Sequence, residues 1–268
     1  MKEILLISDK GGTGKTTLMK MLVEIVGHSA VYADCTFTST WKAYPNIIQE
    51  DYFNLGQEAV VDEFACMGCG DCEYECRFKA IHMFHGQAQV SKSACTGCGH
   101  CIQVCPTGAL SLRKVVGGKV IQKEANGAII VYGTLQYFPR NGIRPVRIIR
   151  DKAVDVIISY QKKLLICEAY PGWNRLTFSL IPFANILMPI IEPHPQVFDF
   201  LSKVNDYQKN YKCNIALIIN KCDLNPIVTK GILEKYPNWN ILTLPYTEGY
   251  LNQGIDKLKP FILPLLVL

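Results

Sequence analysis

The sequence predicts an α/β protein in which a parallel sheet is covered by helices on both faces and carries an inserted α+β domain. Three observations lead to this class. A short apolar run at 4–8 precedes a glycine-rich loop and a helical pattern, strand-like and helical segments alternate after residue 145, and a group of four cysteines recurs 29 residues further along the chain. Alternating strands and helices favour a parallel sheet with both faces buried.

The apolar runs place the individual elements. We expect strands at 4–8, 30–33, 164–167, 186–191, 215–219 and 241–244, and helices at 18–26, 154–160, 195–211 and 226–236. Residues 34–62 are polar and irregular, and residues 119–132 alternate around Asn126-Gly127 like a hairpin. Pro260 and Pro264 oppose a helix near the C-terminus, so we expect that apolar tail to pack on the sheet or on a partner.

Composition narrows the class of protein. The chain has 268 residues, 49% of them hydrophobic, and a net charge of +5, so it has ample apolar surface for a folded core. It has 12 cysteines, eight of them crowded into residues 66–105, which indicates metal ligands rather than a disulfide framework. No segment reaches the roughly 18 to 20 apolar residues of a membrane span, and no signal peptide is recognisable, so we expect a cytoplasmic protein.

The cysteine-rich segment divides the chain. We assign residues 1–62 and 113–268 to one α/β domain and residues 63–112 to an insertion between its second and third core strands. No recognisable module for nucleic acid accompanies the basic residues, so we expect no nucleic-acid partner.

A phosphate-binding loop follows the first strand. Its glycines allow backbone N–H groups to turn toward phosphate oxygens at the start of the next helix. Lys15 is expected to neutralise the terminal phosphates of ATP, and Thr16 to hold Mg²⁺ through its hydroxyl group. The residues expected to bind the nucleotide are Gly11, Gly12, Thr13, Gly14, Lys15, Thr16 and Thr17, preceded by an additional lysine, Lys10.

The cysteine repeat predicts iron–sulfur chemistry. Its pattern, Cys-x-x-Cys-x-x-Cys-x-x-x-Cys, occurs twice and is the sequence form of the bacterial two-cluster ferredoxin. That resemblance implies two [4Fe–4S] clusters, each taking three cysteines from one run and the fourth from the other. The two ligand sets are Cys66, Cys69, Cys72 and Cys105, and Cys95, Cys98, Cys101 and Cys76. Zinc is the alternative, but its usual pairs of Cys-x-x-Cys leave no use for the third cysteine.

The two motifs together resemble the MinD superfamily of P-loop ATPases, in the group that contains an inserted ferredoxin domain. The resemblance implies ATP-dependent dimerisation, with Lys10 reaching the nucleotide of the other subunit, although a lone lysine on a loop is also often simply solvated. By the same analogy, Asn220 hydrogen-bonds the adenine and Pro245 lies close to its face. Asn220 at a strand end is equally an ordinary turn residue.

Two departures from the family pattern concern catalysis. The family's run of alternating aspartates is here Asp34-Cys35-Thr36-Phe37-Thr38, so Asp34 remains as an outer-sphere partner of Mg²⁺, and Thr36 stands where the catalytic carboxylate is expected. A threonine cannot act as a general base near neutral pH. The family's switch segment is represented by Glu168-Ala169-Tyr170-Pro171-Gly172, in which Glu168 keeps the charge on a longer arm. We expect Lys10, Lys15 and Glu168 to serve catalysis, and hydrolysis to be slow or partner-dependent.

These features predict an ATP-binding iron–sulfur protein that couples nucleotide-dependent dimerisation to electron transfer. Its expected partners are a second copy or a related ATPase in a dimer, and a redox protein. Two alternatives remain: an ATPase that carries iron–sulfur clusters for assembly, and a ferredoxin-like electron carrier on a P-loop scaffold that does not hydrolyse ATP. The cofactors expected are two [4Fe–4S] clusters, ATP and Mg²⁺.

Overall fold

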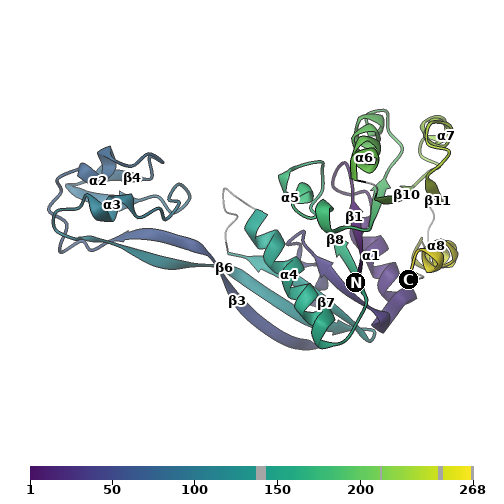
Figure 1. The fold of residues 1–268 in the computed structure, drawn as a ribbon, viewed down its shortest axis with the longest axis horizontal. Helices are drawn as coiled ribbons and strands as arrows, with labels where there is room; N and C mark the ends of the chain where they lie inside the picture. The colour runs from purple at the N-terminus through teal and green to yellow at the C-terminus, as the bar shows by residue number, and fades with distance from the viewer. Residues whose placement is uncertain (137–142, 212, 247–249, 267–268) are drawn as a thin grey trace. The chain divides into compact units, whose positions relative to one another are not determined.

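The computed structural model describes residues 1–136, 143–211, 213–246 and 250–266. The chain forms two compact units (Figure 1). The first, here called the sheet unit, comprises Met1–Glu50, Val120–Thr134 and Val146–Leu268, and the second, the cysteine unit, comprises Asp51–Lys119 and Leu135–Pro145. The domain boundaries expected from the sequence, 1–62 with 113–268 and 63–112, stay a prediction.

The main sheet has nine strands in the order β11-β10-β9-β1-β8-β2-β7-β6-β3. Every neighbouring pair from β11 to β7 is parallel, as the sequence predicts. Its strands are β1 (Lys2–Ile7), β2 (Ala30–Asp34), β3 (Ile47–Val61), β6 (Leu110–Ala125), β7 (Ala128–Leu135), β8 (Leu164–Glu168), β9 (Ile186–Ile191), β10 (Asn214–Asn220) and β11 (Asn240–Leu244).

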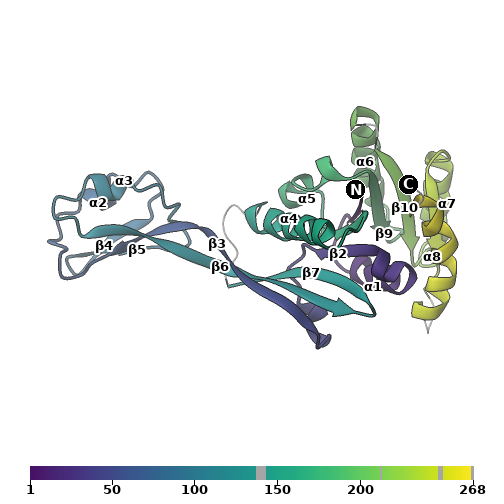
Figure 2. The ribbon, with the colours of Figure 1, turned by 60° about the horizontal axis from the view of Figure 1, so that its bottom comes forward.

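Helices cover both faces of this sheet (Figure 2). One core cluster joins α1 and α8 to the strands, and α4 and α6 lie on the opposite face. The helices of the sheet unit are α1 (Lys15–Val26), α4 (Ile143–Ser159), α5 (Arg175–Phe178), α6 (Val197–Tyr211), α7 (Pro226–Lys235) and α8 (Tyr250–Leu266), with 3-10 turns at Gly27–Ser29, Ser39–Ala43 and Ile181–Phe183. None of the helices in the described ranges combines the length and apolar character that crossing a bilayer requires.

The strand register brings polar residues to one edge of the sheet. Asp34, the last residue of β2, pairs with Glu168, the last residue of β8, and Glu168 in turn lies opposite Leu6 near the end of β1. Asn220, the last residue of β10, lies opposite Leu244 of β11. Ligands of open parallel sheets bind outside the carboxyl ends of the strands, so this edge is where a site is expected.

Two expectations about secondary structure are wrong. Residues 34–62 are not irregular throughout, because they contain the long strand β3. The C-terminal segment is helical, although Pro260 and Pro264 lie inside α8. Leu258 and Ile262 of this helix are fully buried in the core cluster, so packing against the sheet unit outweighs the poor helix propensity of proline.

The cysteine unit is built from two similar halves. Helices α2 (Asp71–Tyr74) and α3 (His100–Gln103) each begin after a glycine in the left-handed conformation, Gly70 and Gly99. The strands β4 (Ile81–Phe84) and β5 (Gln87–Val90) form an antiparallel pair. A small apolar core of Ala59, Ile81, Ala88 and Leu110 packs among the cysteines.

Candidate functional site

The phosphate loop joins β1 to α1 in the conformation that its glycines allow. Gly12 and Gly14 have φ angles of 82° and 96°, in the left-handed region, and α1 begins at Lys15. The Lys15 side chain is buried and its Nζ donates a hydrogen bond of 2.6 Å to Ser8 Oγ. Burial lowers the pKa of Lys15, and the nearby carboxylates of Glu168, Asp9 and Asp34 oppose that shift.

Glu168 faces this loop from the end of β8. Its Oε1 accepts a hydrogen bond of 2.6 Å from Thr16 Oγ1, whereas its buried Oε2 makes no hydrogen bond to any described residue. Burial and the charge of Asp34 raise the pKa of Glu168 to about 8, against the opposing effects of Thr16 and Lys15. A buried carboxylate oxygen without a partner beside a threonine hydroxyl is the oxygen chemistry that Mg²⁺ prefers, so these residues fit the ion.

Asp34 is fully buried and accepts hydrogen bonds from the loop that follows it. Its Oδ1 accepts hydrogen bonds from the Thr36 backbone N–H at 2.8 Å and from Thr36 Oγ1 at 2.5 Å. Burial raises the pKa of Asp34, while its hydrogen bonds with Thr36 act in the opposite direction. The hydroxyl group of Thr36 thus contacts Asp34, and its position in place of a catalytic carboxylate stays a prediction.

These residues surround one cavity of about 380 Å³. A cavity of this size at the start of a helix, lined by glycines and a lysine, fits the phosphates of a nucleotide. Its lining comprises Gly11, Gly12, Gly14, Lys15, Thr16, Thr17, Thr36, Thr38, Glu168, Tyr170 and Pro171. The phosphate loop, Thr36 and Glu168, which are far apart in sequence, thus meet at one site.

The remaining residues expected at the nucleotide lie at the neighbouring strand ends. Asn220 is buried, and its Nδ2 donates a hydrogen bond of 2.8 Å to the backbone carbonyl of Thr13. A Cβ at Gly14 would lie 2.4 Å from that Nδ2 atom, so any side chain at position 14 would collide with Asn220. Pro245 is half-buried and follows β11 directly. A role for either residue at an adenine stays a prediction.

Sequence reasoning assigned no role to the segment that follows β9 (Glu192-Pro193-His194-Pro195). Glu192 forms an ion pair of 3.2 Å with Lys10 Nζ and a second ion pair with Lys221 Nζ. His194 Nε2 lies 2.6 Å from Asp9 Oδ2. This segment therefore holds the first two residues of the phosphate loop, and Lys10 is ion-paired within its own chain. Residues 192 and 10 come together only because β9 lies beside β1 in the folded sheet, and the sequence does not display that strand order.

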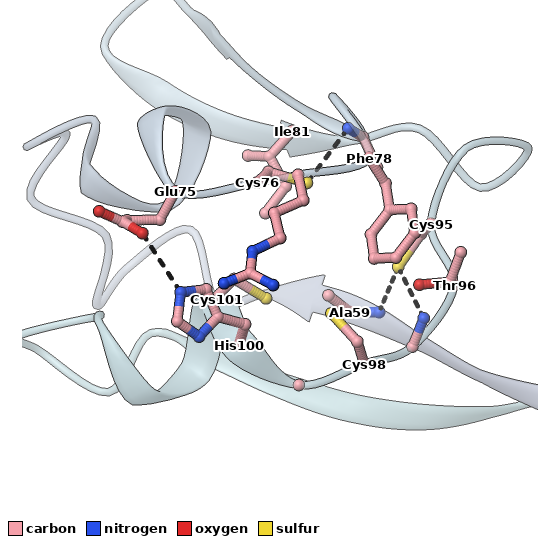
Figure 3. A pocket seen from close by; sticks show the side chains of 14 residues that line it. Ala59, Glu75, Cys76, Phe78, Ile81, Cys95, Thr96, Cys98, His100 and Cys101 are labelled. Atoms are coloured by element: carbon pink, nitrogen blue, oxygen red, sulfur yellow. Dashed lines mark hydrogen bonds and ion pairs between the residues drawn. The ribbon is translucent and has the colours of Figure 1, made fainter.

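The cysteine unit holds two cavities lined by thiols. The first, here called the Cys76 cavity, has a volume of about 290 Å³, and the second is here called the Cys105 cavity. Cys76, Cys95, Cys98 and Cys101 line the Cys76 cavity, and Figure 3 labels these four side chains. Cys66, Cys69, Cys72 and Cys105 line the Cys105 cavity. Each cavity thus takes three cysteines from one run and the fourth from the other.

Backbone amides approach the cysteine sulfurs. Cys95 Sγ accepts from the N–H groups of Ala59 and Gly97, each at 3.4 Å, and Cys76 Sγ accepts from the N–H of Ala80 at 3.3 Å (Figure 3). Such bonds stabilise thiolate ligands and tune the potential of a cluster. Among the described residues, no three or more His, Cys, Asp or Glu side chains are arranged to hold a single metal ion. Four thiols around each cavity, approached by backbone N–H groups, fit the ligand set of an iron–sulfur cluster.

Comparison with known proteins identifies both parts of the chain at the level of fold and domain. Residues 59–112 match the family model of the 4Fe-4S dicluster domain. No match was found among curated protein sequences.

Solved structures resemble nearly the whole chain. A plasmid partition protein of Borrelia burgdorferi bound to AMPPNP is 13% identical, with 99% of each chain covered and a TM-score of 0.54. The cell division ATPase MinD of Pyrococcus furiosus is 13% identical, with 98% of this chain and 99% of that chain covered and a TM-score of 0.51. Apo McdA of Cyanothece is 14% identical, with 97% and 96% covered and a TM-score of 0.51.

The chain therefore has the fold of the MinD and ParA P-loop ATPases, and residues 59–112 form a ferredoxin-type 4Fe-4S domain.

Proposed function

We propose that this protein binds MgATP and two [4Fe–4S] clusters, and couples nucleotide-dependent dimerisation to electron transfer with a redox partner. One observation carries the proposal: a single chain holds a phosphate-binding cavity built around Lys15 and two cavities that are each lined by four thiols. Neither feature alone requires the other. Their combination is best explained by nucleotide binding that acts on a redox protein.

In this proposal the phosphate loop positions the nucleotide. The left-handed glycines direct backbone N–H groups toward the phosphates, and Lys15 supplies a charge held in place by Ser8. Thr16 and the free oxygen of Glu168 would hold Mg²⁺, Thr16 directly. The ion, when bound, would neutralise charge on the phosphates. Asn220 and Pro245 are proposed to enclose the base.

The cysteine unit is proposed to carry the electrons. The clusters, when bound, would supply one-electron redox chemistry. Cys76 and Cys95 accept backbone N–H bonds of the kind that tune the potential of a cluster, and Gly68 and Gly97 allow the chain to pass close to the opposite backbone. Cys69 and Cys98 are exposed, which gives an electron a short route to a docked protein.

The dimer in this proposal is a homodimer or a heterodimer with a related ATPase. Lys10, by analogy with the MinD superfamily, would leave its own Glu192 and reach the partner's nucleotide. Lys221 would remain paired with Glu192 and keep its charge compensated. Hydrolysis is proposed to be slow, because Thr36 stands in the position of the family's catalytic carboxylate.

The test is made on the full chain after anaerobic reconstitution. We expect about eight irons per chain, a visible absorption that dithionite bleaches reversibly, and dimerisation that MgATP promotes in analytical ultracentrifugation. We also expect AMPPNP to shift the reduction potential of the clusters. Four irons per chain would remove the second cluster from the proposal. Clusters that pass to an apo-acceptor protein instead of cycling would favour the assembly ATPase.

A further inference from the structure

The two halves of the cysteine unit are related by a repeat, so their surfaces can be compared position by position. Each residue in 62–75 has a counterpart 29 positions later, in 91–104, and three cysteines occupy matching positions in each half. A difference between the two surfaces is therefore not needed to hold the thiols. It points to a role that only one half has.

Large apolar side chains are exposed in the first half only. Met67 is 67% exposed, Tyr74 is 89% exposed and Phe64 is fully exposed, whereas no large apolar residue in 91–104 is exposed. Their counterparts in the second half are Ser93, Thr96 and Gln103. Single exposed apolar residues are common on proteins, but a group of them marks a contact site. We call Phe64, Met67 and Tyr74 the apolar group.

The charge of the two halves differs in the same way. Residues 62–75 contain five acidic residues and no lysine or arginine, whereas residues 91–104 contain one lysine and no acidic residue. The five acidic residues are Asp62, Glu63, Asp71, Glu73 and Glu75. Glu63 and Asp71 are exposed and form no ion pair with any described residue. The next basic residue along the chain, Arg77, lines the other cavity.

Both features belong to the loop around the Cys105 cavity. Met67 and Cys69 line this cavity, and Cys69 is exposed. Phe64 precedes the first of the three cysteines in this loop by two residues, and Tyr74 follows the third by two residues. A protein that contacts the apolar group would therefore lie beside the thiols of the Cys105 cavity.

The charge and the size of this surface favour one kind of occupant. A second copy docked on the same surface would place acidic residues opposite acidic residues, which is unfavourable. Three side chains also cover much less than the roughly 1,600 Å² of a stable interface, whereas transient redox contacts are smaller than about 1,200 Å². Aromatic residues and methionine are enriched at the centre of protein contacts. An apolar centre beside acidic residues fits a partner that offers an apolar centre beside lysine and arginine.

We propose that the apolar group and the five acidic residues are the docking surface for a redox protein with a basic rim. Electrons then enter or leave the chain through the cluster at the Cys105 cavity. The docked protein takes one electron from that cluster or gives one to it, so that one centre is oxidised as the other is reduced. This inference rests on the proposed function.

The test uses cytochrome c, a small basic protein that accepts one electron, as the probe. The reconstituted full chain is reduced and mixed with it under anaerobic conditions, and the second-order rate constant is measured by stopped flow. Salt screens the attraction between exposed charges beyond about 10 Å at 0.1 M. We expect the wild-type rate constant to fall about tenfold as salt rises from about 10 mM to about 200 mM.

Two triple variants separate the charges from the apolar group. Glu63→Gln with Asp71→Asn and Glu73→Gln should lower the rate constant at low salt about tenfold and remove most of its salt dependence. Phe64→Ser with Met67→Thr and Tyr74→Gln gives the first half the residues of the second half. It should lower the rate constant about tenfold and keep the salt dependence.

The second half supplies the matched control. Ser93→Ala with Gln103→Ala changes exposed residues at the positions that correspond to Phe64 and Tyr74, and should stay within about twofold of the wild type. Isothermal titration of oxidised cytochrome c into the oxidised chain measures docking without electron transfer, and both triple variants should raise this Kd about tenfold. All chains should bind the same amount of iron and reduce menadione, a small uncharged quinone, at the wild-type rate.

A wild-type rate constant and Kd in either triple variant, or an equal loss in the control, would overturn the inference. So would a wild type that reduces menadione but not cytochrome c. A dimer that is lost in ultracentrifugation when the apolar group is replaced would assign this surface to a second copy and would also overturn it. A wild type that binds no iron, or reduces neither acceptor, would instead refute the proposed function.

Discussion

Gly97 offers the sharpest test of the cysteine unit, because Gly70, a second left-handed glycine of the same unit, serves as its control. Gly97 has a φ angle of 69°, and a Cβ built there would lie 2.1 Å from the backbone oxygen of Gln57. Gly70 has a similar φ angle of 83°, but a Cβ there would meet nothing within 4 Å. Gly97→Ala therefore adds a steric conflict to the conformational strain that Gly70→Ala introduces alone.

The expected magnitudes follow from these two contributions. An alanine in the left-handed region costs about 1–2 kcal/mol, and both variants carry that strain. At Gly97 the two backbone segments must also separate by about 1 Å, and forced overpacking of this kind costs about 1–3 kcal/mol more. The displaced segment carries the N–H of Gly97, which donates to Cys95 Sγ. Gly97→Ala should therefore disturb the cluster of the Cys76 cavity as well as the fold.

The assay is iron and sulfide analysis of anaerobically reconstituted chains, with thermal unfolding of the same samples. We expect Gly70→Ala to bind about as much iron as the wild type and to have a modestly lower Tm. We expect Gly97→Ala to lose about half of the iron and to unfold at a lower temperature still. Equal iron content and equal Tm in the two variants would refute the steric argument, because strain alone would then explain both.

Three further outcomes follow from other contacts. Cys105→Ser should alter the electron paramagnetic resonance signal of the cluster held with Cys66, Cys69 and Cys72 and leave the other signal in place; loss of the other signal instead would contradict crossed ligation. Burial acts to raise the pKa of Glu192, but its ion pairs with two lysines outweigh it and lower the pKa, so those pairs stabilise the fold above the unfolded-state pKa and are lost as pH falls through the folded-state value. The Tm difference between wild type and Glu192→Gln should thus be present at about pH 6 and close below about pH 4, and a difference that persists in acid would count against the assignment. Arg150→Met should lower the free energy of unfolding by about 3–5 kcal/mol, because it removes the ion pair of 2.7 Å with Glu3 and leaves that carboxylate buried without its partner. Adding Glu3→Leu should restore most of the lost free energy of unfolding, as measured by urea titration. An additive loss in the double variant would exclude that explanation.

Elements of the fold could be predicted from the sequence where one kind of local pattern dominates. The strand 186–191 is predicted at the bounds that the structure has, because it is a continuous apolar run buried on both sides. Asn126-Gly127 marks the turn between β6 and β7, and both residues adopt the positive φ angles that such a turn needs. The two ligand sets implied by the ferredoxin resemblance contain the same thiols that line the two cavities, and their role as cluster ligands stays a prediction.

The errors come from contacts that the sequence does not display. Residues 47–50 of β3 are exposed, so they lack the alternation by which a half-buried strand is recognised. Helix α4 begins at Ile143, well before the expected start at 154, and its buried Val146 and Ile149 explain why. At the cavity beside the phosphate loop, the sequence indicated Thr36 as a lost carboxylate. The hydrogen bond from its hydroxyl group to Asp34 is visible only in the folded structure.

The exchange of one cysteine between the two runs makes the halves of the cysteine unit depend on each other. Cys76 belongs to the first run and lines the cavity of the second, and Cys105 does the reverse. Neither half, expressed alone, contains four thiols for its own cavity. Each half consequently needs one loop of the other half to complete its set of four thiols. The repeat therefore cannot be shortened to a single run without leaving the remaining cavity one thiol short.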